Sequence, residues 1–252
     1  MRKRLTRGRA WTSLAAAAIA LVGGAVASGT AFAQAPIKLN IWELQMGTPI
    51  VDLPPQYMDP HCGTHGGPQG RRLDGRESFA VCPPDPATGL FEIWFTEDDE
   101  NEYVARAYRS QTFEPGPVAA NILFGHKVIY SVLVDESGLI QGYRIFTDPR
   151  EPEQFRVTAE VLGEAIRGFY GYANFTCTDL PAAEGETEYE GRFLKRLCTA
   201  TVGDRHVEVE RHLFRKPGQS AVDPVTGRAT VNYFESSSRV EVLNISLVPE
   251  QP

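Results

Sequence analysis

Beyond about residue 34, short apolar runs alternate with polar turns, and this pattern favours β-strands. The segment 91–95 (FEIWF) and the segment 128–134 (VIYSVLV) are short and rich in aromatic and β-branched residues. A turn sequence, Asp-Glu-Ser-Gly at 135–138, follows the second segment and leads into another apolar run at 139–148. The segments 128–134 and 139–148 are therefore predicted to form a hairpin.

The same pattern predicts a second hairpin and a last strand. The segments 191–200 and 205–215 flank a Val-Gly-Asp turn and predict a second hairpin. The segment 238–248 predicts a last strand, whose apolar phase slips at Val242 and Leu243. Such a slip indicates either a bulge or a strand that is buried on both faces.

One helix is predicted, over about 149–170. Asp148 suits the N-cap position, Pro149 the first helical position, and Gly171 a C-terminal stop. The apolar residues recur at helical spacing, at Phe155, Ala159, Leu162, Ile166 and Phe169. We expect this stripe to pack on the sheet. The segment 97–109 fits a turn plus strand or a short helix, and the sequence does not choose between them.

These elements predict an α+β fold, in which one clear helix packs on a β-rich antiparallel sheet. The Pro- and Gly-rich stretch 113–119 suggests a boundary between a module at 34–114 and a module at 115–252. The stretch 215–230 reads as a long exposed loop.

The first 33 residues resemble a Sec-type signal peptide. Basic residues precede an Ala-rich apolar run, and Ala31-Phe32-Ala33 fits a cleavage signal. An uncleaved membrane anchor is the competing interpretation, but the Ala richness and the Gly23-Gly24 pair favour cleavage after Ala33. The sequence therefore predicts a periplasmic or secreted protein.

Removal of this segment changes the charge. It holds five of the 25 basic residues and none of the 32 acidic residues, so the remainder has a formal net charge of −12. Such an acidic surface repels phosphate backbones, which argues against a nucleic-acid partner. No later apolar run has the length of a membrane span, so we expect a soluble protein without stable membrane insertion.

Four cysteines in an exported chain predict two disulfides. Three connectivities are open, and the simplest pairs Cys62 with Cys82 and Cys177 with Cys198. The segments 74–82 and 190–198 also align without gaps from an acid-Gly-Arg start to an apolar-Cys end. A tandem duplication of modules would produce this similarity, and so would chance.

The stretch DPHCGTHGGPQGRR at 59–72 carries the most unusual chemistry. His61 and His65 could form part of a metal site, although oxidation of Cys62 would remove the thiolate ligand. The glycines do not match a phosphate-binding loop, because no strand is expected over 57–62 and no Lys-Ser/Thr pair follows.

A set of arginines close to this stretch could bind an anion such as a carboxylate or sulfate. Scattered surface arginines are the competing interpretation. The residues concerned are Arg71, Arg72 and Arg76.

The predicted strand 205–215 contains a second set of polar residues. Alternation puts His206, Glu208, Glu210 and His212 on one face, over apolar residues on the other. This face could bind a metal or transfer protons, or it could be a solvated surface. The chain contains no G-x-S-x-G, H-E-x-x-H or C-x-x-C motif, and no cofactor is predicted.

These observations favour a non-catalytic binding or structural protein. Its expected partner is another envelope protein or a small ligand held between the two halves. The alternative is a metal-assisted hydrolase that uses His61 or His65 together with His206 or His212. The alternative requires folding to bring these two sets of histidines within ligand distance.

Overall fold

The computed structural model describes residues 40–97, 121–151, 153–216, 220–222, 229–231 and 234–248, which belong to one compact unit, Pro36–Pro252. The predicted signal peptide, the boundary at 113–119 and nearly all of the ambiguous segment 97–109 lie outside the described residues. No helix within the described residues is long and apolar enough to cross a membrane.

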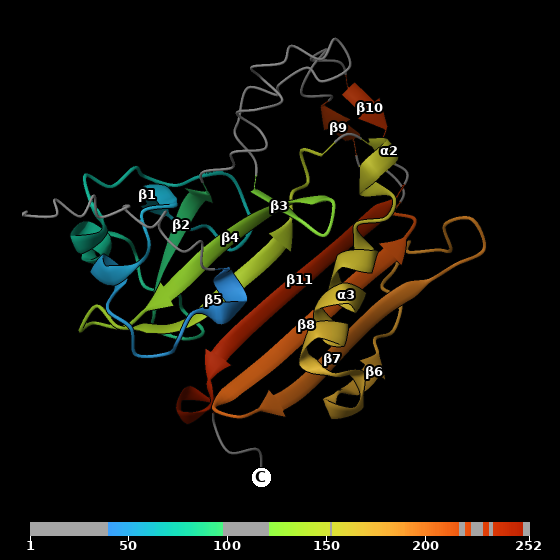
Figure 1. The fold of residues 1–252 in the computed structure, drawn as a ribbon. Helices are drawn as coiled ribbons and strands as arrows, with labels where there is room; N and C mark the ends of the chain where they lie inside the picture. Colours follow the sequence, from blue (N-terminus) through green and yellow to red (C-terminus); the bar gives the residue numbers. More distant parts are fainter. Residues whose placement is uncertain are drawn as a thin grey trace, which may run out of the picture. The chain divides into compact units, whose positions relative to one another are not determined.

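A nine-stranded antiparallel sheet is the framework of this unit (Figure 1). Its strands are β1 (Tyr57–Cys62), β2 (Phe91–Glu97), β3 (Asn121–Leu123), β4 (His126–Val134), β5 (Ile140–Thr147), β6 (Thr176–Asp179), β7 (Leu194–Val202), β8 (Arg205–Phe214) and β11 (Glu235–Asn244). They are ordered β1-β2-β4-β5-β11-β8-β7-β6, and β3 pairs with β4. The predicted antiparallel sheet is therefore confirmed, and strands from both predicted modules belong to it.

The predicted hairpins are present as β4–β5 and β7–β8. Gly138 and Gly203 have φ angles of 81° and 63° in their turns, a left-handed region that glycine enters without steric cost. The predicted loop 215–230, in contrast, contains β9 (Ser220–Val222) and β10 (Ala229–Val231), which form a separate two-stranded antiparallel sheet.

The last strand is shorter than predicted. β11 ends at Asn244, and a 3-10 helix, η5 (Ile245–Leu247), follows it. β11 pairs with β5 and β8 without a register shift, so the apolar slip is not a bulge. Val242 belongs to the main core, whereas Leu243 packs with Leu90 and Leu133 in a second cluster. This part of β11 is therefore buried on both faces.

The predicted helix is divided into α2 (Glu153–Arg156) and α3 (Glu160–Tyr170). At the division, Ser236 Oγ donates to the carbonyl of Val157, and Ser238 Oγ donates to the carbonyl of Ala159. Because β11 hydroxyls satisfy backbone groups there, the chain can interrupt its helix at the sheet surface. Gly171, with φ at 88°, ends α3 as expected.

The predicted apolar stripe is only partly buried. Ala159, Leu162 and Ile166 are inaccessible, but Phe155 and Phe169 are 51% and 52% exposed. The prediction was wrong for these two residues because α2 is a separate, short helix and Phe169 lies beside Trp42 at the surface, with ring centroids 5.6 Å apart.

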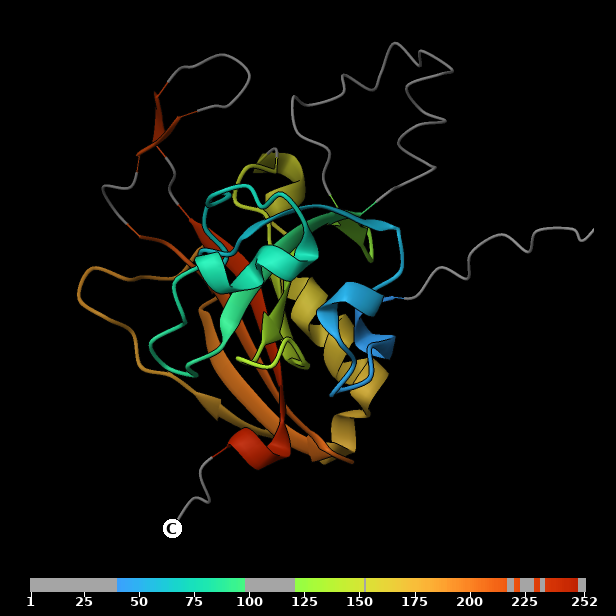
Figure 2. The same cartoon turned by 90° about the vertical axis from the view of Figure 1, so that its left-hand side faces the viewer.

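The main core lies between α3, one face of the sheet and the N-terminal 3-10 turns η1 (Ile41–Glu43) and η2 (Ile50–Asp52). Figure 2 shows η1 and η2, in blue, beside α3. Two more 3-10 helices, η3 (Arg76–Val81) and η4 (Tyr172–Asn174), follow β1 and α3. Polar side chains of the sheet also contact α3 on this face.

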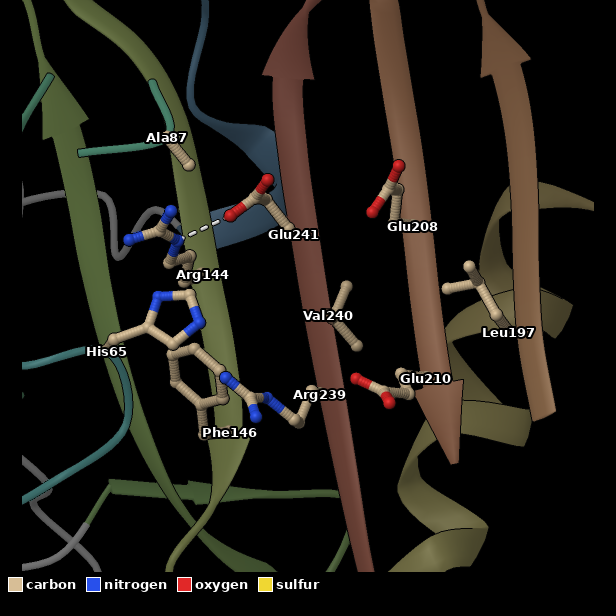
Figure 3. A pocket seen from close by; sticks show the side chains of 10 residues that line it. All are labelled: His65, Ala87, Arg144, Phe146, Leu197, Glu208, Glu210, Arg239, Val240 and Glu241. Carbon is tan, nitrogen blue, oxygen red and sulfur yellow. Dashed lines mark hydrogen bonds and ion pairs between the residues drawn. The ribbon is translucent and has the colours of Figure 1, made fainter. Parts of the chain in front are cut away.

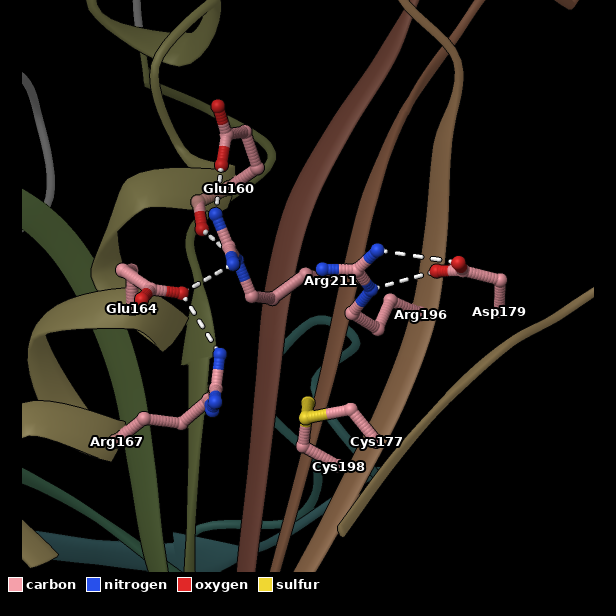
Figure 4. Close-up of a disulfide and its surroundings, with 8 residues drawn as sticks. All are labelled: Glu160, Glu164, Arg167, Cys177, Asp179, Arg196, Cys198 and Arg211. Carbon is pink, nitrogen blue, oxygen red and sulfur yellow. Dashed lines mark hydrogen bonds and ion pairs between the residues drawn. A yellow bond between two sulfur atoms is a disulfide. The ribbon is translucent and has the colours of Figure 1, made fainter. Parts of the chain in front are cut away.

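Arg211 of β8 fastens α3 to the sheet (Figure 4). Its Nε donates to the carbonyl of Glu160 over 2.8 Å, and its Nη2 lies 2.6 Å from Glu160 Oε2. Its Nη1 donates to Glu164. The Arg211 side chain is 11% exposed and that of Glu160 only 4%, so this is a desolvated ion pair. Gly163 allows the close approach, because an added methyl group would lie 2.7 Å from Arg211 Cγ.

The two predicted disulfides are present, Cys62–Cys82 and Cys177–Cys198. The segments that align around their second cysteines nevertheless differ in structure. Cys82 follows the 3-10 helix η3, whereas Cys198 lies within β7, directly opposite Cys177 of β6. Their structures therefore add no support to a duplication of modules.

Arg211→Met should lower the free energy of unfolding by about 3–5 kcal/mol, because it leaves the buried Glu160 carboxylate without its main partner. Denaturant titration measures this loss. Arg196→Met is the matched control, since Arg196 pairs with Asp179 at the exposed edge of the sheet and should matter little. Equal effects of the two substitutions would contradict the assigned role of Arg211.

Candidate functional site

The sheet face opposite α3 carries charged side chains in register. Alternation turns Val209 and Arg211 toward α3, so the neighbouring residues of β8 face the other way. Strand pairing aligns them in two adjacent rows across β5, β11, β8 and β7. The first row is Arg144, Glu241, Glu208 and Thr199, and the second is Phe146, Arg239, Glu210 and Leu197.

A hollow of about 300 Å³ lies over these rows. Figure 3 shows its walls, with Glu208 and Glu210 on one strand, Arg239 and Glu241 on the next, and His65 and Phe146 beyond them. Its wall thus combines the open face of the sheet with loop residues from the N-terminal half of the chain.

The glycine-rich loop 63–70 reaches this face through close backbone contacts. Gly66 has φ at 79° and lies against the ring of Phe146, where an added methyl group would be 2.7 Å from Cγ. The amide of His65 donates to Glu92 Oε2 over 2.9 Å, and that of Gly63 to the Glu92 carbonyl over 2.7 Å. These contacts explain the glycines: the backbone must bend left-handed and approach side chains closely.

Arg144 lies beneath the hollow and is 1% exposed. Its Nη1 is 2.8 Å from Asp85 Oδ2 and 3.2 Å from Glu92 Oε2, and its Nε is 2.5 Å from Glu241 Oε2. Burial lowers the pKa of Arg144, but the hydrogen bond to Asp85 and the charge of Glu241 outweigh burial and raise it. One guanidinium group therefore pairs with three carboxylates, so this cluster carries an excess of negative charge.

The pKa of the Asp85 carboxyl group lies below its ordinary value. Burial alone would raise its pKa, but hydrogen bonds from Arg144 and from the amides of Thr88 and Ala87 lower the pKa to about 2. The Asp85 carboxylate therefore stays ionised at neutral pH and holds the loop 85–88 against Arg144.

His65, Asp85 and Glu92 place potential metal-ligating atoms within 4.8 Å of one another. The guanidinium of Arg144 already binds both carboxylates, and Glu92 also accepts a hydrogen bond from Ser131 Oγ over 2.6 Å. A metal ion would have to displace Arg144, so the geometry favours an ion-pair network. Burial, together with Arg144 and Arg239, lowers the pKa of His65, and its ring is neutral at pH 7.

The predicted histidines have different surroundings. His65 lines the hollow, but His61 lies against Trp94, with ring centroids 5.6 Å apart. On β8, His206 Nε2 is 3.1 Å from Glu208 Oε1, and His212 Nε2 is 2.9 Å from Glu210 Oε1. Among the described residues, the potential metal cluster contains His65 and none of the other three histidines.

One expectation for the segment 57–76 was wrong. Residues 57–62 form strand β1, whose register shift between Met58 and His61 and positive φ at Asp59 hid the strand pattern. The three arginines of the predicted anion patch have different surroundings, and the guanidinium of Arg76 donates to the carbonyls of Pro54 and Tyr57 over 2.7 and 2.6 Å. Arg72 pairs with Asp59 at 2.7 Å, and Arg71 is exposed.

Sequence reasoning missed Arg144, Arg239 and Glu241, which line the hollow, and Asp85 and Glu92, which pair with Arg144. Only Arg144 carried a recognisable signal, as a charged residue within the apolar segment Gly-Tyr-Arg-Ile-Phe of a predicted strand. A buried charge requires partners, so its position indicated that acidic groups would converge on it.

Asp85→Asn should cost up to about 2 kcal/mol of unfolding free energy near neutral pH. Because the folded-state pKa of Asp85 lies below its ordinary value, the ionised carboxylate stabilises the fold above about pH 4, and this contribution disappears as the pH falls toward 2. Denaturant titrations of both proteins along this range measure the effect. Asp59→Asn controls for the loss of one exposed carboxyl group, and a pH-independent difference for Asp85→Asn would contradict the expectation.

Gly66→Ala should destabilise the protein more than Gly185→Ala. Both glycines have positive φ, 79° and 83°, but nothing lies within 4 Å of a methyl group added at Gly185. The control therefore reports backbone strain of about 1–2 kcal/mol. Gly66→Ala adds the clash with Phe146, worth about 1–3 kcal/mol more. Equal losses in thermal or denaturant unfolding would show that the loop 63–70 is not packed as described.

Comparison with known proteins adds no family to this description. No family model matches the chain, and neither a curated protein nor a solved structure does so.

Proposed function

We propose that this chain is an exported, non-catalytic binding protein and that the hollow on the open sheet face binds a small ligand. The observation that carries the proposal is the hollow itself, a concave site of about 300 Å³ with charged walls. Loops of the N-terminal half, with His65 and Ala87, and strands of the C-terminal half supply its walls. A ligand there would contact both halves, as the sequence led us to expect.

The walls are preorganised, which favours binding. Arg239 lies over the ring of Phe146, 5.1 Å from its centroid, and Gly66 and His65 hold that ring from the loop side. Glu208 Oε1 is hydrogen-bonded to His206 Nε2, and Glu210 Oε1 lies 2.9 Å from His212 Nε2 of the same strand. Side chains that are already oriented lose little entropy on binding, so more of the interaction energy appears as affinity.

The size of the hollow restricts the ligand. About 300 Å³ is at the lower end of the range for small-molecule pockets. This volume suits a metabolite rather than a folded partner or a polymer.

The hydrolase alternative has less support. It requires His61 or His65 to converge with His206 or His212 on a metal, and these histidines are instead engaged with Trp94, Phe146, Glu208 and Glu210. The two disulfides fit a protein that folds outside the reducing cytoplasm. We therefore place its ligand in the periplasm or the extracellular medium.

A small-molecule screen tests this function. The protein is expressed with its own N-terminal segment, and native mass spectrometry is used to detect co-purified molecules. NMR titration with a metabolite library then gives affinities. We expect at least one ligand whose affinity falls about tenfold or more in Glu210→Gln, because charged hydrogen bonds are worth about 1.5–3 kcal/mol.

Arg71→Gln is the control, since Arg71 is exposed and does not line the hollow. Its affinity for the same ligand should match that of the unchanged protein. Failure to find any small ligand would overturn the function, and a ligand whose affinity changes in neither Glu210→Gln nor Arg239→Gln would show that it binds outside the hollow.

A further inference from the structure

The hollow retains charges that the protein itself does not pair. Arg239 has no carboxylate oxygen within 4.0 Å among the described residues, and its contact there is the face of Phe146. Strand pairing puts Glu210 opposite Arg239, yet no ion pair joins the two side chains. In Figure 3 the guanidinium group of Arg239 lies at the hollow, and its nitrogen atoms point toward none of the labelled carboxylates. It can therefore donate to a ligand.

Opposite charges are available on the next strand. Glu208 and Glu210 each contact a histidine through Oε1, and no group of the described residues donates to either Oε2 atom. The Glu208 side chain is 44% exposed and that of Glu210 30%, so both can reach a bound molecule. Leu197, in the same row as Glu210, adds an apolar surface at the end of the hollow.

We infer that the ligand is a small zwitterion of the amino-acid or short-peptide class, whose carboxylate binds Arg239 and whose ammonium group binds Glu208 and Glu210. This inference rests on the proposed function and specifies its ligand. The volume of about 300 Å³ accommodates such a molecule.

Simpler ligands fit the charges less well. An anion without a cationic group would enter a site lined by three carboxylates and two guanidinium groups, with two more carboxylates bound to Arg144; the carboxylates are those of Glu208, Glu210, Glu241, Asp85 and Glu92. An amine without a carboxylate would exclude water from Arg239 and leave its donors unsatisfied, which carries a desolvation cost. Only a ligand with both groups satisfies both walls.

Calorimetric titration of the intact protein with the proteinogenic L-amino acids and their dipeptides is the first test. The tightest ligand is then compared with two analogues that each lack one charge. With leucine as the example of the tightest ligand, here and below, these are isopentylamine, which lacks the carboxylate, and 4-methylpentanoate, which lacks the ammonium group. Each analogue should bind about tenfold or more weakly than leucine, since each loses a charge-assisted hydrogen-bonding group.

Two substitutions assign the ends of the ligand. Arg239→Gln should reduce the affinity for leucine to that of isopentylamine and leave isopentylamine binding unchanged. Glu210→Gln should weaken leucine and isopentylamine but not 4-methylpentanoate. Arg71→Gln should leave all three affinities unchanged, and circular dichroism confirms that each variant is folded.

The outcomes separate this inference from the proposed function. The inference that the ligand is a zwitterion would be overturned if isopentylamine bound as tightly as leucine, or if Arg239→Gln left the affinity for leucine unchanged. The same holds if a metabolite of another class binds in the hollow while no amino acid or dipeptide does, and the proposed function would then stand. The absence of any small ligand would overturn both.

Discussion

The buried guanidinium of Arg144 is the interaction on which the open side of this protein depends. It lies in the centre of the sheet, on β5, and binds Glu92 of β2, Glu241 of β11 and Asp85 of the loop before β2. A desolvated charge is costly unless its hydrogen bonds are complete, so these partners are held firmly. Through Glu92, which also accepts the amide of His65, the network extends to the glycine-rich loop. The position of one arginine thus determines where two loops lie.

The two faces of the sheet meet different requirements. On one face, α3 covers the valines of β8 and β11, and Arg211 and the β11 serines satisfy the polar groups that this packing buries. On the other face, apolar packing is confined to small clusters such as Trp94, Ile129 and Phe146. The side chains of Glu208 and Glu210 remain partly exposed beside them. This asymmetry produces a rigid support with a polar, concave surface, which is the arrangement that a binding site needs.

Several features followed from local sequence. The hairpins β4–β5 and β7–β8 were predicted, because alternation and turn chemistry act over a few residues. The polar face of β8 was predicted for the same reason, and His206, Glu208, Glu210 and His212 share it. β1 was missed because a register shift and a left-handed residue at Asp59 interrupt its alternation. The exposure of Phe155 and Phe169 was missed because spacing along a helix does not reveal what covers each turn.

By itself, the sequence determined the antiparallel, β-rich character of the chain, the end of the helix at Gly171, the presence of two disulfides and the polar face of β8. These properties depend on backbone conformation and on residue type at short range. Only the tertiary structure decided that β11 lies between β5 and β8, which brings Arg239 and Glu241 beside Glu208 and Glu210. It also decided that His65 meets Phe146, whereas His61 meets Trp94. Such contacts join residues far apart in the chain, and they arise from strand order and side-chain packing, which no local pattern encodes.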